Sequence, residues 1–213
     1  MASDSTPRND EKSSFIAEAR RAQIIGAAIT TLDEIGYVGA SLAQIAKRAG
    51  ISTALISYHF RDKTDLMDHT LMSLLGEASE YVRQRTQGAV TAREKLHAYV
   101  LASMAFQGTN PKHYVALLEI VFNARTPDNV PYYKLNDDEV EPAVLELQHI
   151  LRDGQASGEF RAFHIDVMTY AIRGAIGEYL MNPALTNAVN LETYSEELLR
   201  IFDRVVLREE GSL

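Results

Sequence analysis

The sequence predicts an all-α protein of about nine helices, with a small three-helix N-terminal domain ahead of a larger helical domain. Apolar residues recur at helical spacing along most of the chain, and no run alternates in the manner of a strand. Capping pairs precede three predicted helices, and Asn110 before Pro111 marks the start of a fourth. The pairs are Ser41–Gln44, Thr91–Glu94 and Asn136–Glu139.

The predicted helices follow the apolar spacing and end at glycine or proline. They cover about 14–36, 41–48, 52–59, 63–87, 91–107, 111–125, 137–157, 166–181 and 191–208. We expect three regions, which are a disordered tail (1–13), a first domain (14–62) and a second domain (63–213). The first helix carries an apolar stripe that supplies the core of the first domain. The stripe consists of Ile24, Ala28, Leu32 and Ile35.

Charge is unevenly distributed along the chain. The net charge is −8, of which residues 1–63 contribute +1 and residues 64–213 contribute −9. A weakly basic N-terminal domain can approach phosphates while the acidic remainder keeps the molecule in solution.

Composition excludes several classes of function. The absence of cysteine excludes disulfides, thiolate zinc sites and cysteine nucleophiles. No apolar run approaches the roughly 20 residues that a membrane span needs, and the polar start MASDSTPRNDEKSS lacks the apolar core of a signal peptide. Motifs of metalloproteases, phosphate loops and serine hydrolases are also missing. We therefore expect a cytoplasmic protein without metal, cofactor or enzymatic activity.

Residues 41–60, SLAQIAKRAGISTALISYHF, have the pattern of a helix-turn-helix motif. Ser41 can cap the first helix, Gly50 supplies a left-handed turn, and Ile51 and Ile56 point into the corner. The first helix has an apolar face formed by Leu42, Ile45, Ala46 and Ala49. The pattern favours DNA binding, although corners of this kind also occur in proteins that do not touch DNA.

The second helix of the motif would present hydroxyl, methyl and phenol groups, which suit base edges in a major groove. These outward residues are Thr53, Ala54, Ser57 and Tyr58. His59, Lys63 and Ser41 are assigned to phosphates, because they lie near the helix termini. Further candidates for phosphate contact are Lys47, Arg48, Arg20 and Arg21. Alternatively, Tyr58 is a core aromatic residue, and Arg20 and Arg21 form a solvated helix face.

The segments ARRAQIIGAAITTLDEIGY (19–37), SLAQIAKRAGIS (41–52) and LISYHFRDKTDLM (55–67) resemble the tetracycline-repressor (TetR) family of bacterial regulators. The resemblance covers roughly residues 16–70. It implies a homodimer whose two DNA-binding domains read a palindromic operator, and it adds Tyr37 to the phosphate-contacting residues. Many members have Tyr where this chain has Ser57, so an aromatic contact is missing here.

The resemblance also implies that the second domain binds a small-molecule effector. The candidate pocket residues are apolar side chains of several helices, together with nearby polar groups and a helix glycine. They are Leu71, Leu75, Met104, Leu118, Glu119, Phe122, Leu147, Tyr170, Gly174 and Glu178. A buried Glu119 or Glu178 would favour a cationic or hydrogen-bond-donating effector.

Dimerisation through the last two helices is a further implication of the resemblance. In the last helix, Leu191, Tyr194, Leu198, Ile201 and Val205 follow a seven-residue repeat suited to a helix bundle. The candidate interface residues are Ile176, Tyr179, Leu180, Tyr194, Leu198, Ile201, Phe202 and Val205. The alternative for this pattern is packing within one chain.

The predicted function is a repressor that a small molecule releases from its operator, by shifting the helix that begins near Lys63. The alternative is a DNA-binding regulator without a small-molecule ligand, controlled by a partner or acting as an activator. An enzyme built on a helical bundle is disfavoured, because the histidines are scattered and no catalytic motif is present.

Overall fold

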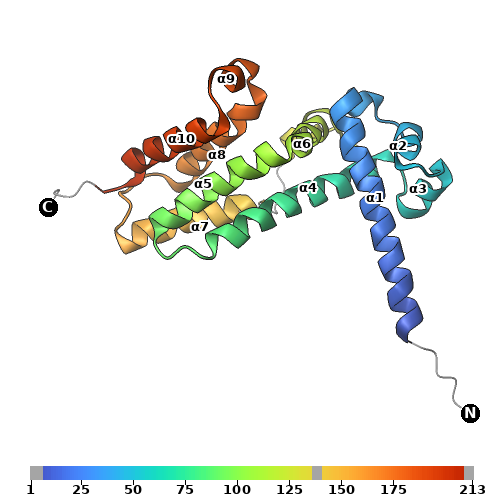
Figure 1. The fold of residues 1–213 in the computed structure, drawn as a ribbon, viewed down its shortest axis with the longest axis horizontal. Coiled ribbons are helices and arrows are strands. Elements are labelled where there is room, and N and C mark those ends of the chain that lie inside the picture. Colours follow the sequence, from blue (N-terminus) through green and yellow to red (C-terminus); the bar gives the residue numbers. More distant parts are fainter. Residues whose placement is uncertain (1–6, 136–140, 209–213) are drawn as a thin grey trace, which may run out of the picture. The chain divides into compact units, whose positions relative to one another are not determined.

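The computed structural model describes residues 7–135 and 141–208, and the regular elements in these stretches are all helices (Figure 1). They are α1 (Pro7–Gly39), α2 (Leu42–Ala49), α3 (Thr53–His59), α4 (Lys63–Thr86), α5 (Ala92–Thr109), α6 (Pro111–Asn123), the 3₁₀ turn η1 (Tyr132–Lys134), α7 (Pro142–Ser157), α8 (Ile165–Met181), α9 (Pro183–Ala188) and α10 (Leu191–Val206). The predicted all-α class is confirmed. None of the helices described is both long and apolar enough to cross a membrane.

Two compact units share the chain. The unit that we call the head consists of Met1–Leu74 and Lys112–Asn136, and the unit that we call the body consists of Leu75–Pro111 and Asp137–Leu213. This division differs from the predicted boundary at residue 63, because the start of α4 and the part of α6 from Lys112 onward pack with the first three helices. A three-helix unit of this size buries little apolar surface, so its stability alone would be marginal.

The head core joins residues that are distant in the sequence. Ile24, Ile45 and Ile56 of α1, α2 and α3 are fully buried in the same cluster as Leu66 of α4 and Ile120 of α6. The apolar spacing within α1, α2 and α3 predicted that Ile24, Ile45 and Ile56 face the core. The contribution of α6 depends on tertiary packing instead.

Helix α1 departs from the prediction at both ends. Residues 1–6 of the predicted tail lie outside the described residues, and from Pro7 onward the backbone is helical. Near its other end the helix is broken at Gly36, where φ is 69° and ψ is 174°. Ile35 was expected in the core, but it is 48% exposed and its side chain lies beside Gly39 instead.

Capping chemistry explains where several other helices begin. Thr91 and Glu94 form the predicted reciprocal capping box at the start of α5. The Asn136–Glu139 pair lies outside the described residues. Helix α9 was not predicted, because Pro183 was interpreted only as a break. Its start repeats the Asn-Pro signal used for α6, since the Asn182 side chain accepts a hydrogen bond from the Leu185 N–H.

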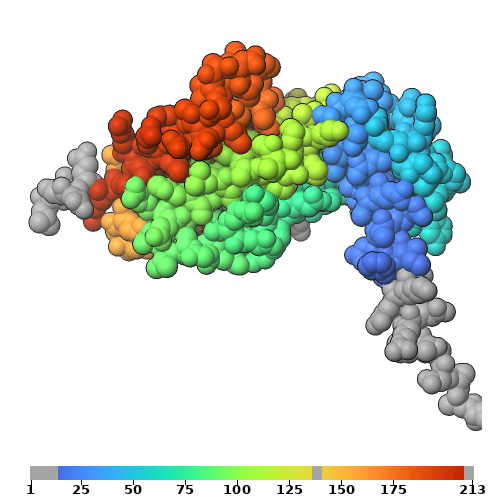
Figure 2. All heavy atoms as spheres, in the orientation of Figure 1, coloured from blue at the N-terminus to red at the C-terminus, as the bar shows by residue number. Residues whose placement is uncertain are grey.

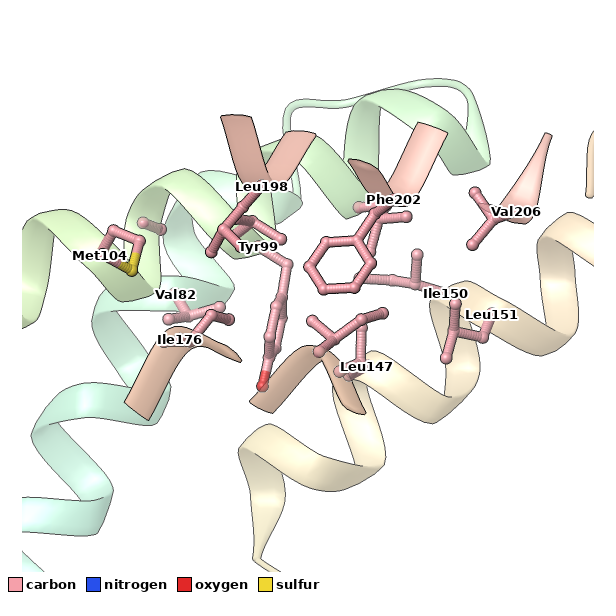
Figure 3. Packing of buried hydrophobic residues seen from close by; sticks show 14 of the residues in the cluster. Val82, Tyr99, Met104, Leu147, Ile150, Leu151, Ile176, Leu198, Phe202 and Val206 are labelled. Carbon is pink, nitrogen blue, oxygen red and sulfur yellow. The ribbon is translucent and has the colours of Figure 1, made fainter. Parts of the chain in front are cut away.

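The body is built around Tyr99 of α5, which is 1% exposed (Figure 3). Residues from α7, α8 and α10 surround its ring, including Leu147, Ile176 and Phe202. The Tyr99 hydroxyl donates a 3.0 Å hydrogen bond to the carbonyl of Ala143, so this buried polar group is satisfied.

Candidate nucleic-acid interface

The turn between α2 and α3 has the geometry that the sequence predicted. Gly50 adopts a left-handed conformation with φ 67° and ψ 32°, a region that β-carbons disfavour. The Ile51 N–H donates to the carbonyl of Ala46 at 3.1 Å, which closes the end of α2. The Ser52 hydroxyl accepts a 3.2 Å hydrogen bond from the Leu55 N–H and begins α3. Backbone geometry therefore fixes the angle between the two helices.

Helix α3 presents an uncharged face to solvent. Thr53, Ala54 and Ser57 are exposed, and Tyr58 is 81% exposed, so the alternative that Tyr58 is a core aromatic is excluded. Ile56 on the opposite face is fully buried, which fixes the rotation of the helix. Figure 2 shows α2 and α3, in cyan, open at the surface in this view. Hydroxyls, a methyl group and a phenol suit the edges of bases more than phosphates.

Lys63 and Tyr37 form a compact cationic group at the start of α4. Lys63 Nζ donates to the Tyr37 carbonyl at 2.6 Å and lies 4.3 Å from the centre of the Tyr37 ring. Burial lowers the pKa of Lys63, and burial together with Asp68 raises the pKa of the Tyr37 phenol. The ammonium is thus held in one place, with two further N–H groups available for an anion.

The other predicted phosphate residues differ in how available they are. Ser41 is exposed and caps α2, accepting from the Gln44 N–H at 3.2 Å. Because this bond uses an acceptor site, the Ser41 hydroxyl can still donate to a phosphate. Lys47 is exposed, and His59 is half-buried with its ring 5.0 Å from that of Tyr58.

Two of the additional arginine candidates are engaged within the head. Arg48 forms an ion pair with Glu34 and donates to the Thr31 hydroxyl at 3.1 Å. Arg21 donates to the carbonyl of His59 at 3.3 Å and so ties α1 to the end of α3. Both have a structural role that the sequence did not reveal.

Glu119, a candidate for the effector pocket, lies in the head. Its Oε2 accepts a 2.8 Å hydrogen bond from the Tyr37 N–H and a 3.2 Å bond from Asn123 Nδ2. The Glu119 carboxylate therefore provides a hydrogen-bond acceptor for the backbone at the break in α1. A β-carbon at Gly36 would lie 3.2 Å from the same oxygen, so the close approach also requires glycine.

Asp68 and Tyr132 also belong to this region, and sequence reasoning missed both. The Tyr132 hydroxyl donates to Asp68 Oδ1 at 2.5 Å, and burial together with this bond raises the pKa of the phenol. Tyr132 lies in η1, in a stretch that the sequence indicated only as an irregular loop. No local pattern marks a partner 64 residues away.

The remaining pocket candidates are divided between the two units. Leu71, Leu118 and Phe122 belong to the head with Glu119, and Phe122 is 51% exposed. The body holds Leu75, Met104, Leu147, Tyr170, Gly174 and Glu178. Of these, Met104 and Leu147 are packed in the core, whereas Tyr170, Gly174 and Glu178 are exposed. Periodicity identified apolar faces, but it did not determine which faces meet.

A hollow of about 280 Å³ lies elsewhere on the body. It is lined by Thr86, Gln87, Ala89, Lys95, Glu146, His149, Ile150 and Asp153, none of which was a pocket candidate. Its lining is mainly polar and charged, unlike the apolar pockets that hold most small ligands.

The dimer candidates also need correction. Ile176, Tyr179, Leu198 and Phe202 are 5–7% exposed and pack in the core of the body, so they serve the single chain. Leu180 and Tyr194 are half-buried against the same core. Ile201 and Val205 remain exposed, at 49% and 37%. The seven-residue repeat predicted for the last helix combined residues of a buried face and of an exposed face of α10. The buried face consists of Ser195, Leu198, Phe202 and Val206.

Two helices joined by a left-handed glycine, with an exposed uncharged face on the second, define a helix-turn-helix protein. Residues 24–70 match the model of bacterial regulatory proteins of the tetR family. The N-terminal part of the chain therefore matches that family, as the resemblance in the sequence implied.

Curated regulators are similar to part of the chain, and solved structures share its fold. The HTH-type transcriptional regulator BetI of Paraburkholderia phytofirmans is 38% identical over 94 residues, which are 44% of this chain and 48% of that protein. The chain thus spans about half the length of the curated relatives that it matches. The fatty acid degradation regulator FadR from Bacillus halodurans has a similar fold, with a TM-score of 0.73 and 21% identity over 85% of this chain and 93% of that one. FadR from Bacillus subtilis, solved in complex with stearoyl-CoA, has a TM-score of 0.72 and 21% identity over 84% and 96%.

Proposed function

We propose that this protein is a transcriptional regulator that binds double-stranded operator DNA through α2 and α3. The observation that carries the proposal is the exposed face of α3, held at a fixed rotation by buried Ile56 and flanked by the Lys63–Tyr37 group. Base-reading groups and a phosphate-binding cation thus lie on the same unit, as recognition of a groove requires. The family match over residues 24–70 supports the same assignment.

Selection of bound fragments from the genome of the source organism, followed by footprinting, tests this proposal. We expect protection of a short palindrome, and we expect Ser57→Ala and Thr53→Ala to change the preferred bases within it. Each lost base contact should reduce the free-energy difference between binding the preferred base and binding a wrong base by about 1–3 kcal/mol. Protein that binds DNA without sequence preference, or not at all, would contradict the proposal.

Homodimerisation is the second part of the proposal, and α8 offers a suitable face. Its exposed residues Val167, Tyr170, Gly174, Glu178 and Met181 are spaced by three and four positions. No other heavy atom lies within 4 Å of a β-carbon built at Gly174, so another helix can approach closely there. Exposed Ile201 and Val205 on α10 extend the apolar surface, since α8 and α10 are in contact. A second copy would cover both helices.

Analytical ultracentrifugation of the full chain tests the dimer. We expect Tyr170→Lys to shift the protein from dimer to monomer and Val90→Lys, at an exposed position between α4 and α5, to leave the dimer intact. Dimers that persist in Tyr170→Lys together with Ile201→Lys would place the interface elsewhere.

Control by a small molecule completes the proposed function, with the protein acting as a repressor that its effector releases. A structural neighbour is solved with stearoyl-CoA, and α4 contributes residues to both units. An effector that prefers the conformation with low DNA affinity would lower operator occupancy. Titration of the operator complex with cell extract fractions should release DNA. A complex that no extract weakens would favour a regulator without a small-molecule ligand.

A further inference from the structure

The polar hollow of the body is lined by one face of α7 and by parts of α4 and α5. Its residues are Thr86, Gln87 and Ala89, at the end of α4 and in the turn after it, Lys95 of α5, and Glu146, His149, Ile150 and Asp153 of α7. The turn between α4 and α5 lies beside α7 in Figure 1. The volume of about 280 Å³ is near the lower limit of ~300 Å³ for sites that hold small molecules, so the hollow suits a small solute.

The floor of the hollow is buried, and its edges are open to solvent. Thr86 and Ile150 are 2% and 3% exposed. His149 and Asp153 are exposed, and Lys95 is half-buried. A solute can therefore enter from the solvent and reach charged groups without any change in the core of the body.

Opposite charges line this hollow without meeting each other. Lys95 belongs to α5, whereas Glu146 and Asp153 belong to α7. Among the residues that the structure describes, no hydrogen bond or ion pair engages the Lys95 ammonium or the Asp153 carboxylate. Both charges are thus available to a molecule that lies between them.

Glu146 supplies a second carboxylate, which is already held in place. Its Oε1 accepts a 2.8 Å hydrogen bond from the hydroxyl of Thr86, a residue of the buried floor. Within the described stretches of the chain, Oε2 has no hydrogen-bond donor. This oxygen can therefore accept from an ammonium group.

The two signs of charge define the class of ligand. A small anion would be attracted by Lys95 but repelled by two carboxylates, and a small cation would be repelled by Lys95. A molecule that carries both charges can form charge-assisted hydrogen bonds with each side of the hollow. The polar lining offers little surface to an apolar body.

We propose that the hollow binds a small zwitterion with an ammonium group and a carboxylate, such as a free amino acid. Lys95 pairs with the carboxylate, and Glu146 and Asp153 pair with the ammonium group. Binding joins the end of α4, α5 and α7 through one molecule, so it stabilises the folded body. The inference goes beyond the proposed function, because it requires neither operator DNA nor its release.

Titration calorimetry of the full chain tests the site with L-serine and 4-aminobutyrate, which carry the two charges at different separations. Each is compared with one analogue that lacks the ammonium group and one that lacks the carboxylate. These analogues are glycerate and ethanolamine for L-serine, and butyrate and butylamine for 4-aminobutyrate. We expect at least one zwitterion to bind at millimolar concentration or below and to raise Tm. Each of its two analogues should bind at least tenfold more weakly.

Variants of the two sides of the hollow assign each charge of the ligand to its partner. Lys95→Gln should bind the zwitterion at least tenfold more weakly, and it should no longer distinguish the zwitterion from the analogue without a carboxylate. Asp153→Asn should also weaken binding and should reduce the preference over the analogue without an ammonium group. Arg200→Gln and Glu196→Gln, which remove exposed charges of each sign from α10, should bind like the original protein.

Three outcomes would overturn the inference. The first is that neither zwitterion binds at millimolar concentration. The second is that an analogue binds as tightly as its zwitterion, since one charge would then be sufficient. The third is equal affinity in Lys95→Gln and the original protein, which would place the ligand outside the hollow. None of these measurements contains DNA, so their failure would leave the proposed operator binding untouched.

Discussion

Glu119 Oε2 accepts a 2.8 Å hydrogen bond from the backbone N–H of Tyr37, the first residue after the break in α1. At a helix break the N–H groups that follow lose their intrahelical partners, and here a carboxylate from α6 replaces one of them. The carbonyl of the same Tyr37 residue accepts from Lys63 Nζ. The backbone of Tyr37 thus connects α6 with Lys63, the cation proposed to bind phosphate.

Replacement of Glu119 should weaken both the head and its DNA binding. We expect Glu119→Ala to lower the free energy of unfolding by about 1–3 kcal/mol, because the Tyr37 N–H loses its acceptor in a half-buried position. Operator affinity should fall as well, since the Tyr37–Lys63 group loses one of its supports. Urea unfolding and fluorescence anisotropy with labelled operator measure the two effects.

Two variants separate this hydrogen bond from general effects. Glu119→Gln keeps an acceptor and should stay close to the original protein in both measurements. Asn123→Ala removes the other side chain bonded to the same carboxylate but leaves the Tyr37 bond, so its effect should be small. If Asn123→Ala lowered stability and operator affinity as much as Glu119→Ala, loss of the hydrogen bond to the Tyr37 N–H would not explain the effect of Glu119→Ala.

The left-handed turn at Gly50 should be sensitive to a single methyl group. We expect Gly50→Ala to destabilise the protein by about 1–2 kcal/mol, because a β-carbon is strained at φ 67°. Steric contact is not the cause, since no atom lies within 4 Å of the added carbon. Thermal unfolding and operator binding should both reveal the change in the helix-turn-helix.

Gly26→Ala is the matched control, because it adds the same methyl group at an exposed position inside α1, also with no atom within 4 Å. There the substitution should stabilise the helix by about 0.5–1 kcal/mol. Effects of the same sign at both positions would rule out backbone strain as the explanation for Gly50.

The contrast between these glycines shows what the sequence could predict. The helix-turn-helix depends on contacts within about twenty residues, so its cap, turn and buried face follow from spacing. The roles of Glu119, Asp68 and Tyr132 depend on partners 64–82 residues away, which no local pattern specifies. Their assignment required the tertiary structure.

In the body the sequence located apolar faces but not their partners. Tyr170, predicted to line a pocket, lies on the exposed face of α8, whereas Ile176, predicted to face a second chain, is in the core. Both residues fit a helical repeat equally well, because helices in a bundle have apolar residues on more than one side. Only packing decides which side is covered within one chain.

Lys63 should contribute to DNA affinity mainly through charge. We expect Lys63→Met to weaken operator binding and to reduce the slope of log affinity against log salt concentration by about 0.9, the value for one phosphate contact on B-DNA. Loss of its bond to Tyr37 should also lower stability slightly, so unfolding is measured in parallel. Arg200→Met, which removes an exposed charge from α10, should leave the salt slope unchanged. A salt slope that is equal in Lys63→Met and the original protein would exclude a phosphate contact at this residue.

Asp203 should make the stability of the body dependent on pH. Burial alone would raise its pKa, but hydrogen bonds from Arg93 at 2.6 Å and His97 at 2.7 Å outweigh burial and hold the pKa below its ordinary value. A carboxyl whose pKa is lowered by folding stabilises the protein above its unfolded pKa of about 3.9, and this contribution is lost as the pH falls through the folded value.

We therefore expect Asp203→Asn to lower the free energy of unfolding by about 1–2 kcal/mol at pH 5–7, a modest loss because Arg93 is half exposed. The difference from the original protein should shrink below about pH 4, because the Asp203 carboxyl of the unfolded original protein then takes up a proton before the folded one does. Urea unfolding at pH 7, 5, 4 and 3.5 measures it. Glu196→Gln, an exposed ion-pair member on the same helix, should have little effect at any of these pH values. A deficit in Asp203→Asn that stays constant down to pH 3.5 would show that the carboxylate charge is not what stabilises this contact.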